Sequence, residues 1–441
     1  MLKTRILAAA VACILLQPAY ATTTRLSESS LGAEADSSSF SVKLSDDGRF
    51  AVFQTNATNL FPGDTNAVSD VLLKDMQTGA LTCMSCGLGG IVGDGASSSP
   101  AISGDGRFVA FQSAATNLVA GDNNIATDVF VREIATGTLE IASRATGVAG
   151  AQGSATSGQA RLSSTGQFVV FSSTATNLVT GDTNSQADAF VRDRLTSVTS
   201  RVSVATGGAQ ASGGVGGATA STISADGRFV VFTSGQQTLS SGDTNTLADA
   251  FLHDRQTTTT ERLSTTQGTT GSCLDPTISA DGSMLAFSST FADLVAGDNN
   301  VVRDTFYRAR TGTVLTRITA AGAVEANNTL EVPAFNGNGT KIAFQSAASN
   351  LVAGDSNAAN DIFSLVIGTG VITRVSVSTA GLEANGSSTF PWYASASDIV
   401  AFSSGASNLI ANDANASVDT FANRLSTVDP DAFLRDGFES P

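Results

Sequence analysis

The stretch Gly121-Asp122-Asn123-Asn124-Ile125-Ala126-Thr127-Asp128 decides the fold, because versions of it occur seven times along the chain. Every copy has an Asp, an Asn two residues later and a second Asp four residues after that. Each copy begins eleven residues after a Phe, and successive Phe residues lie 55 to 61 positions apart. Repetition at such a period indicates an array of equivalent supersecondary units. The seven copies are Asp64, Asn66 and Asp70; Asp122, Asn124 and Asp128; Asp182, Asn184 and Asp188; Asp243, Asn245 and Asp249; Asp298, Asn300 and Asp304; Asp355, Asn357 and Asp361; and Asp413, Asn415 and Asp419.

The residues around each copy predict four strands per unit. In the second unit, residues 100–103 form a short first strand, and Asp105-Gly106 favours a two-residue hairpin turn. Residues 108–111 are apolar at every position, which indicates a strand covered on both faces. Residues 129–132 and 139–142 supply the third and fourth strands after the Asp/Asn loop. Four antiparallel strands with two apolar faces describe one blade of a β-propeller.

The two ends of the repeat array predict how the ring closes. The seventh unit lacks a good fourth strand, whereas residues 24–27, Thr-Arg-Leu-Ser, look like the fourth strands at 201–203, 262–264 and 374–376. An N-terminal strand that completes the last blade would remove an exposed edge. We therefore predict an all-β, seven-bladed propeller of four-stranded blades over residues 22–426, followed by a C-terminal tail at 427–441.

The N-terminus reads as a signal peptide over residues 1–21. Lys3 and Arg5 precede an apolar run at 6–16, and Ala19-Tyr20-Ala21 has the small-x-small pattern of a cleavage site. A lipoprotein site at Cys13 would leave a very short apolar core. We expect a periplasmic or extracellular protein with cleavage after Ala21 and no membrane insertion.

The charge restricts the classes of partner. The chain has a formal net charge of −15 at pH 7, which repels phosphate backbones and anionic headgroups. We therefore expect no nucleic-acid or membrane partner. Cations and basic partners stay compatible with this charge, and so does a simple role in keeping the protein soluble.

The string Ser103-Gly104-Asp105-Gly106-Arg107-Phe108-Val109-Ala110-Phe111 resembles the repeats of TolB-type propellers, as does Phe190-Val191-Arg192-Asp193 in a third strand. The resemblance covers nearly the whole chain after residue 21 and implies the propeller fold and a location in the cell envelope. TolB itself has six blades and an additional N-terminal domain, and works in the Tol–Pal system. This chain has seven repeats and no room for that domain, so a Tol–Pal role is not implied.

Two interpretations of the Asp/Asn loops stay open. Calcium takes six to eight oxygen ligands from Asp, Asn and carbonyl groups, so each of the seven loops is a candidate calcium site, with Asp, Asn and Asp as its ligands. Alternatively, Asp and Asn shape the turn by bonding their own backbone, and Gly precedes the first Asp in six copies. We favour the turn and expect no cofactor other than calcium.

Three cysteines remain after residue 21. Cys83 and Cys86 are spaced for a disulfide in an oxidising compartment, while Cys273 lies four repeats away. The pair falls on a predicted strand rather than at a helix N-terminus, which argues against redox catalysis.

Catalytic residues are hard to find in this sequence. The single histidine, His253, is expected on an exposed strand surface, and no Gly-x-Ser-x-Gly motif occurs. Near the axis the first strands carry few acids, of which Asp275 and Glu331 are the nearest pair. Trp392 and Tyr393 offer a ligand platform or, as we favour, fill the core of the last blade. The positions expected to face the axis are Lys43, Arg161, Thr222, Thr277, Ala334 and Trp392.

We therefore expect an exported, non-catalytic scaffold, not an enzyme, that binds a protein or glycan of the envelope or medium and is a monomer. The alternative is a carbohydrate-active or other hydrolase or lyase that uses the central channel.

Overall fold

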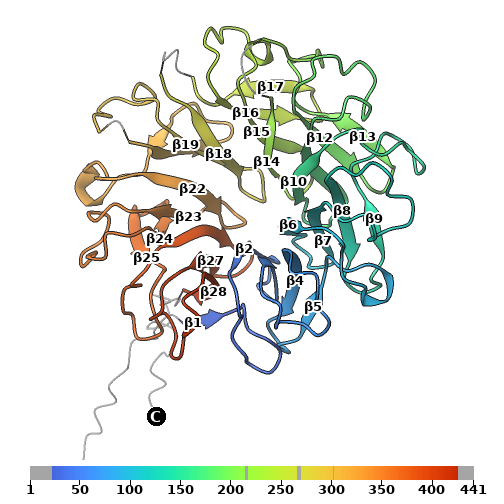
Figure 1. The fold of residues 1–441 in the computed structure, drawn as a ribbon. Coiled ribbons are helices and arrows are strands. Elements are labelled where there is room, and N and C mark those ends of the chain that lie inside the picture. The colour runs from blue at the N-terminus through green and yellow to red at the C-terminus, as the bar shows by residue number, and fades with distance from the viewer. Residues whose placement is uncertain (1–21, 214–216, 266–269, 301, 426–441) are drawn as a thin grey trace, which may run out of the picture.

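The computed structural model describes residues 22–213, 217–265, 270–300 and 302–425. These residues form seven antiparallel sheets of four strands each, arranged as a ring (Figure 1). The predicted all-β seven-bladed propeller is thereby confirmed. The predicted signal peptide and C-terminal tail lie outside the described residues.

The first four blades follow the chain in order, each with its innermost strand first. Blade 1 contains β2 (Ser39–Leu44), β3 (Phe50–Thr55), β4 (Asp70–Asp75) and β5 (Leu81–Cys83). Blade 2 contains β6 (Ser97–Ile102), β7 (Phe108–Ser113), β8 (Asp128–Glu133) and β9 (Leu139–Ile141). Blade 3 contains β10 (Ser157–Leu162), β11 (Phe168–Ser173), β12 (Asp188–Asp193) and β13 (Val198–Arg201). Blade 4 contains β14 (Thr219–Ile223), β15 (Phe229–Ser234), β16 (Asp249–Asp254) and β17 (Thr259–Arg262).

The remaining blades complete the ring. Blade 5 contains β18 (Cys273–Ile278), β19 (Met284–Ser289), β20 (Asp304–Ala309) and β21 (Thr316–Arg317). Blade 6 contains β22 (Leu330–Phe335), β23 (Lys341–Ser346), β24 (Asp361–Val366) and β25 (Val371–Arg374). Blade 7 contains β26 (Ser388–Tyr393), β27 (Ile399–Ser404), β28 (Asp419–Arg424) and β1 (Thr22–Arg25). Three short 3-10 helices lie in the connections: η1 (Leu88–Gly90), η2 (Gln237–Leu239) and η3 (Ala321–Ala323).

The N-terminal strand closes the ring, as predicted. Strand β1 pairs antiparallel with β28, from Thr22 opposite Arg424 to Arg25 opposite Phe421. In Figure 1 the blue β1 lies beside the red β28. Blade 7 is therefore built from both ends of the chain and has no unpaired fourth-strand position.

The fourth strands end earlier than the sequence suggested. Strand β13 stops at Arg201, so the string Arg201-Val202-Ser203 starts at the strand end instead of forming the strand. The amides of Val202 and Ser203 both point to the carbonyl of Ala189, at 2.8 and 3.4 Å. Because both amides are directed at one carbonyl, the regular pairing of the fourth strand with the third ends here. The Ser203 side chain then faces the Asp/Asn loop.

The core lies between the sheets. The second and third strands are buried on both faces, and six blades stack a Phe of the second strand on a Phe of the third at 5.5 to 5.9 Å. In blade 1 a Leu, Leu72, faces Phe53 instead. Large aromatic side chains bury much apolar area each, so these pairs contribute strongly to blade stability.

The turns between first and second strands join into a ring around the axis. Seven backbone hydrogen bonds of 2.8 to 3.1 Å link each blade to the next, from Asp46 N to Gly104 O round to Ala396 N to Asp46 O. Gly104 permits this approach, because a Cβ there would lie 2.1 Å from the Asp46 carboxylate. The turns thus narrow one end of the central channel.

Candidate functional site

The Asn of each Asp/Asn loop holds the loop in shape. Its side-chain oxygen accepts the backbone N–H two residues on in all seven loops, at 2.8 to 3.2 Å. In six loops its amide nitrogen also donates to a carbonyl of the link to the next blade, as Asn66 does to Gly93 O. The loop asparagines are Asn66, Asn124, Asn184, Asn245, Asn300, Asn357 and Asn415, of which Asn245 has no second contact within the described ranges.

This arrangement differs from the one expected of calcium ligands. An Asn that binds calcium turns its amide oxygen toward the ion. The oxygens of the loop asparagines turn instead to their own backbone, at Val68 for Asn66, Ala126 for Asn124, Gln186 for Asn184, Leu247 for Asn245, Val302 for Asn300, Ala359 for Asn357 and Ser417 for Asn415. The Asn therefore has the turn-forming role that we favoured from the sequence.

The second Asp of each loop begins the third strand and is buried. In six blades it accepts a hydrogen bond from a Ser after the fourth strand, such as Ser203 Oγ to Asp188 Oδ1 at 2.5 Å. Burial raises the pKa of Asp70 and Asp249 to about 6. A positive charge near such a carboxylate therefore offsets much of the free-energy cost of burying it. The seven residues at this position are Asp70, Asp128, Asp188, Asp249, Asp304, Asp361 and Asp419.

An arginine at the end of the fourth strand supplies that counter-charge in most blades. Arg201 Nη1 lies 3.4 Å from Asp182 Oδ1 and 3.3 Å from Asp188 Oδ2, so it joins the first and second Asp of one loop. In blades 4, 5 and 6 an arginine does the same at 3.0 to 3.7 Å, namely Arg262 between Asp243 and Asp249, Arg317 between Asp298 and Asp304, and Arg374 between Asp355 and Asp361. The sequence showed this arginine but gave no sign of its partner.

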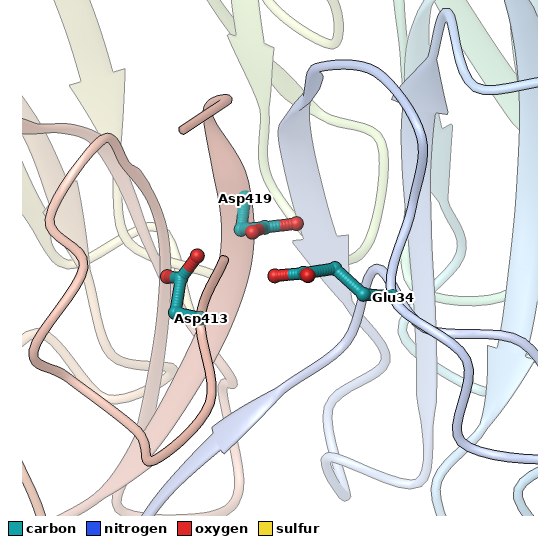
Figure 2. Close-up of side chains that lie close together, drawn as sticks. All are labelled: Glu34, Asp413 and Asp419. Atoms are coloured by element: carbon teal, nitrogen blue, oxygen red, sulfur yellow. The ribbon is translucent and has the colours of Figure 1, made fainter. Parts of the chain in front are cut away.

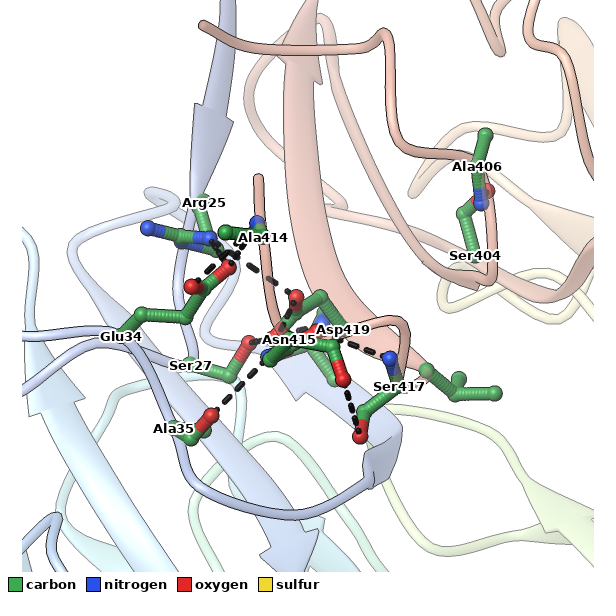
Figure 3. A network of polar contacts seen from close by, with 12 residues as sticks. Arg25, Ser27, Glu34, Ala35, Ser404, Ala406, Ala414, Asn415, Ser417 and Asp419 are labelled. Atoms are coloured by element: carbon green, nitrogen blue, oxygen red, sulfur yellow. Dashed lines mark hydrogen bonds and ion pairs between the residues drawn. The ribbon is translucent and has the colours of Figure 1, made fainter. Parts of the chain in front are cut away.

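The closing blade uses an arginine from the other end of the chain. Glu34, Asp413 and Asp419 bring their carboxylates together, with oxygens within 4.8 Å of one another (Figure 2). Arg25 of β1 points at them and lies 2.5 Å from Glu34 and 3.8 Å from Asp419 (Figure 3). A similar set, Asp355, Asp361 and Glu383, surrounds Arg374. Both acidic clusters thus already contain a cation.

Blades 1 and 2 have no arginine at this position. In blade 2 the matching residue is Ile141, and the Gln152 amide replaces the guanidinium, 2.7 Å from Asp122 Oδ1 and 2.8 Å from Asp128 Oδ2. In blade 1 the matching residue is Cys83, which is bonded to Cys86. Among the described residues, Asp64 and Asp70 are the predicted ligands with neither a guanidinium nor a glutamine amide between them.

A second candidate site is the axial channel. A cavity of about 420 Å³ runs along the axis, lined by the first strand of every blade. Each first strand contains a β-bulge. In six blades the first residue of the bulge has a positive φ of 52 to 57°. These residues line the cavity, namely Ser41, Ser99, Gln159, Asp275, Val332 and Phe390. Backbone strain held at one place in successive blades is typical of a functional surface, and bulges redirect side chains.

The cavity wall combines two cations with an aromatic ring. Lys43 and Arg161 line the cavity together with Trp392, and Lys43 Nζ lies 4.4 Å from the centre of the Trp392 ring. The surrounding protein removes water from Lys43, and the Arg161 charge adds to this effect, so the pKa of Lys43 lies well below its usual value. Burial also lowers the pKa of Arg161, to about 10. Among the described residues neither side chain forms an ion pair.

The other residues predicted near the axis divide into two groups. Thr222, Thr277 and Ala334 line the cavity, as does Asp275. Glu331 is instead held by Arg303 at 2.5 Å and by Gln345 at 3.1 Å. Asp275 and Glu331 are therefore not both free for joint acid–base work, in line with the absence of a pairing signal in the sequence.

The two aromatic residues of β26, the first strand of blade 7, also differ from each other. Tyr393 is a core residue, bonded to Ser364 at 3.1 Å, as we favoured. Trp392 is half-buried and packs against the core between blades 7 and 1, with Nε1 donating to Leu44 O at 3.3 Å, and it also lines the cavity. The indole is thus available to a ligand in the channel.

His253 is buried, which corrects the prediction that it is exposed. Only 4% of the residue is accessible, and its Nδ1 lies 2.9 Å from Thr260 Oγ1. Third-strand positions of this kind face the neighbouring blade, as Arg192 does when it bonds the Ala145 and Gly147 carbonyls. Burial lowers the pKa of His253 to about 4. Cys273 is buried too, and Cys83 and Cys86 form a disulfide.

No protein-family model and no curated protein matches the sequence. Solved structures do share its fold. An oligogalacturonate lyase in complex with manganese has a TM-score of 0.53 and 13% identity, over 92% of this chain and 93% of that one. An acylaminoacyl peptidase in complex with a chloromethyl ketone has a TM-score of 0.50 and 8% identity, over 96% of this chain and 54% of that one. A TolB from Acinetobacter baumannii also matches, with a TM-score of 0.39 and 14% identity, over 77% of this chain and 63% of that one.

The lyase and peptidase matches confirm the propeller fold and correct the expectation that the chain is not an enzyme. A lyase and a peptidase are built on propellers of this kind, so the scaffold does not exclude catalysis. Within the described ranges, no helix has the length and apolar character needed to span a bilayer.

Proposed function

We propose that the axial channel binds an acidic saccharide and cleaves it by elimination, so that the chain is a polysaccharide lyase. The observation that carries this proposal is the pair Lys43 and Arg161, which face one cavity beside Trp392 without an acidic partner among the described residues. Arginine suits the carboxylate of a uronic acid, and an aromatic face suits a sugar ring. The site thus fits a ligand with both features.

The low pKa of Lys43 supplies a base for the reaction. Loss of water around Lys43 lowers the pKa of its amine, which favours the neutral form that can accept a proton. Arg161 can pair with the sugar carboxylate and so make the neighbouring C–H bond more acidic. Lys43 takes that proton, the electrons of the C–H bond form a carbon–carbon double bond, and the bond to the glycosidic oxygen breaks. The leaving oxygen takes a proton from water.

The oligogalacturonate lyase with this fold was solved with manganese. Manganese favours carboxylate, carbonyl and water ligands. Asp46 and Asp275 are carboxylates of the cavity wall, contributed by blades 1 and 5, while His253 lies in β16 outside the lining. In the described part of the chain, groups of three such ligands occur only in the loops of blades 6 and 7. The channel residues therefore do not fit such an ion, and the proposed reaction rests on Lys43 and Arg161.

The test is to incubate the purified protein with polygalacturonate, alginate and, as an uncharged control, amylose. We expect the ultraviolet absorbance of an unsaturated product from an acidic polymer and none from amylose. Lys43→Met should abolish the product while the protein still binds the polymer. Binding without product would make the protein a saccharide-binding propeller instead, and an absence of both binding and product would contradict the proposal.

A further inference from the structure

We propose that the first blade binds one calcium ion between Asp64 and Asp70, and that the other six Asp/Asn loops bind none. The seven repeats are otherwise alike but differ in the group that lies between the two Asp residues of the loop. Blades 2 to 6 place an N–H donor or a guanidinium between the two Asp residues of each loop, and blade 7 places Arg25 against its second Asp. Among the described residues, blade 1 has no such group.

The residues that fill this space elsewhere are both replaced in blade 1. Cys83 stands where blade 3 has Arg201, since Cys83 lies opposite Leu72 as Arg201 lies opposite Phe190. The disulfide directs the Cys83 side chain to Cys86. Val92 stands where blade 2 has Gln152, immediately before the carbonyl that accepts the loop Asn. A valine side chain cannot donate a hydrogen bond.

Two carboxylate oxygens are left without a partner as a result. Asp64 Oδ1 and Asp70 Oδ2 are buried and have no hydrogen-bond partner within the described part of the chain. In blade 2 the equivalent atoms are the two oxygens that Gln152 contacts, and in blade 3 they are the two that Arg201 contacts. Asp70 is 1% accessible, so these oxygens point into the space that a donor or cation fills in the neighbouring blades.

The size and ligand type of this space fit calcium. In blade 2 the Gln152 nitrogen lies 2.7 and 2.8 Å from the two oxygens, close to the calcium–oxygen distance of about 2.3–2.6 Å. A backbone carbonyl is available as well, because Arg317 of blade 5 donates to Gly297 O at 2.9 Å and Gly63 holds the same place in blade 1. Waters would complete the six to eight ligands.

Calorimetry with calcium chloride on the chelator-treated full-length protein tests this inference. We expect one ion per chain and a rise in melting temperature when calcium is added. Val92→Gln gives blade 1 the side-chain amide that Gln152 places between the two carboxylates of blade 2. It keeps Asp64 and Asp70, so it should abolish calcium binding. Asp64→Asn should weaken binding by about tenfold or more.

The matched control is Gln152→Val in blade 2, which opens the equivalent space there because Ile141 already stands at the arginine position. It should raise the stoichiometry from one ion to two, while Asp122→Asn in the otherwise unchanged chain should leave it at one. Unchanged binding in the Val92→Gln protein would place the ion elsewhere and overturn the inference. No heat and no change in melting temperature with the unmodified protein would overturn it as well.

Discussion

Lys43 and Trp392 meet across the seam between the first and last blades, with the lysine Nζ 4.4 Å from the centre of the indole ring. The two residues come from β2 and β26, so the contact exists only in the closed ring. An amino group attracted to an aromatic face is held in one place at the cavity wall. The proposed ligand would therefore bind where the two ends of the chain come together.

Removal of the Arg161 guanidinium from the channel should weaken binding of acidic saccharides. Arg161→Ala is expected to raise the dissociation constant for polygalacturonate fragments by about tenfold or more, because a charge-assisted pair is lost in a partly dehydrated site. Calorimetric titration measures this change. Arg107→Ala, which removes a guanidinium whose side chain is 61% accessible on the outer surface, is the control and should bind normally. Equal losses in both variants would point to general charge attraction.

Substitution of Trp392 should affect saccharide binding, whereas substitution of its neighbour Tyr393 should affect the stability of the fold. Trp392→Ala removes part of the cavity wall and should weaken saccharide binding without preventing folding. Tyr393→Phe loses the hydrogen bond to Ser364 inside blade 7 and should cost about 1 kcal/mol of unfolding free energy, with normal binding. Denaturant unfolding and a binding titration on both variants check this. The prediction is wrong if Tyr393→Phe alone weakens binding.

Asp70 should make stability depend on pH. Its pKa is about 6 in the folded protein against 3.8 ordinarily, so the folded state binds the proton more tightly. The cost of the buried charge is therefore absent below pH 3.8, develops between pH 3.8 and 6, and is complete above pH 6. In the presence of a chelator, Asp70→Asn should stabilise the protein by about 2–3 kcal/mol at about pH 7.5 and by nothing at about pH 3.5.

The control for Asp70→Asn is Asp188→Asn in blade 3. Asp188 pairs with Arg201, so its neutralisation leaves a buried guanidinium with one partner fewer and should destabilise the protein at about pH 7.5. Urea unfolding at the two pH values measures both variants. A gain in stability from both substitutions would mean that Arg201 does not compensate the buried charge.

Arg25 should be essential for closure of the ring. Arg25→Ala leaves Asp419 and Glu34 without their cation, and loss of one partner of a buried pair costs about 3–5 kcal/mol. Thermal unfolding should show the loss, and amide exchange should be fastest in β1 and β28. Arg49→Ala, an ion-pair partner of Asp75 on the surface, should change stability little. Similar losses in both would contradict the special role of Arg25.

The sequence was sufficient to predict the number of blades and the closing strand. Each blade repeats local signals, such as the Asp105-Gly106 turn and the apolar run ending at Phe111, and local signals do not depend on distant contacts. The loop Asn residues also act in the turn, as expected, because their partners lie two residues away. The residues expected near the axis, Lys43 and Arg161 among them, do line the channel.

What the sequence could not show depends on contacts between distant segments. Arg201 and Asp182 pair only after the fourth strand folds back beside the loop, and His253 is buried only because a neighbouring blade covers it. The bulges that turn Gln159 and Phe390 into the channel depend on backbone register, which composition does not reveal. The pair Asp64 and Asp70 is uncompensated because of Cys83 and Val92, which lie outside the loop in sequence and reach it only in the folded blade.

The pairing of β1 with β28 has a consequence for biosynthesis. Residues 22–25 leave the ribosome nearly four hundred positions before residues 421–424, so they must wait for their partner strand. Contacts at such separation slow folding, because the intervening chain must first be ordered. Until then the edge of β28 offers an open hydrogen-bonding surface, on which a leading segment from another molecule can dock. Capture of this edge by the wrong chain would join two molecules through exchanged N-terminal strands.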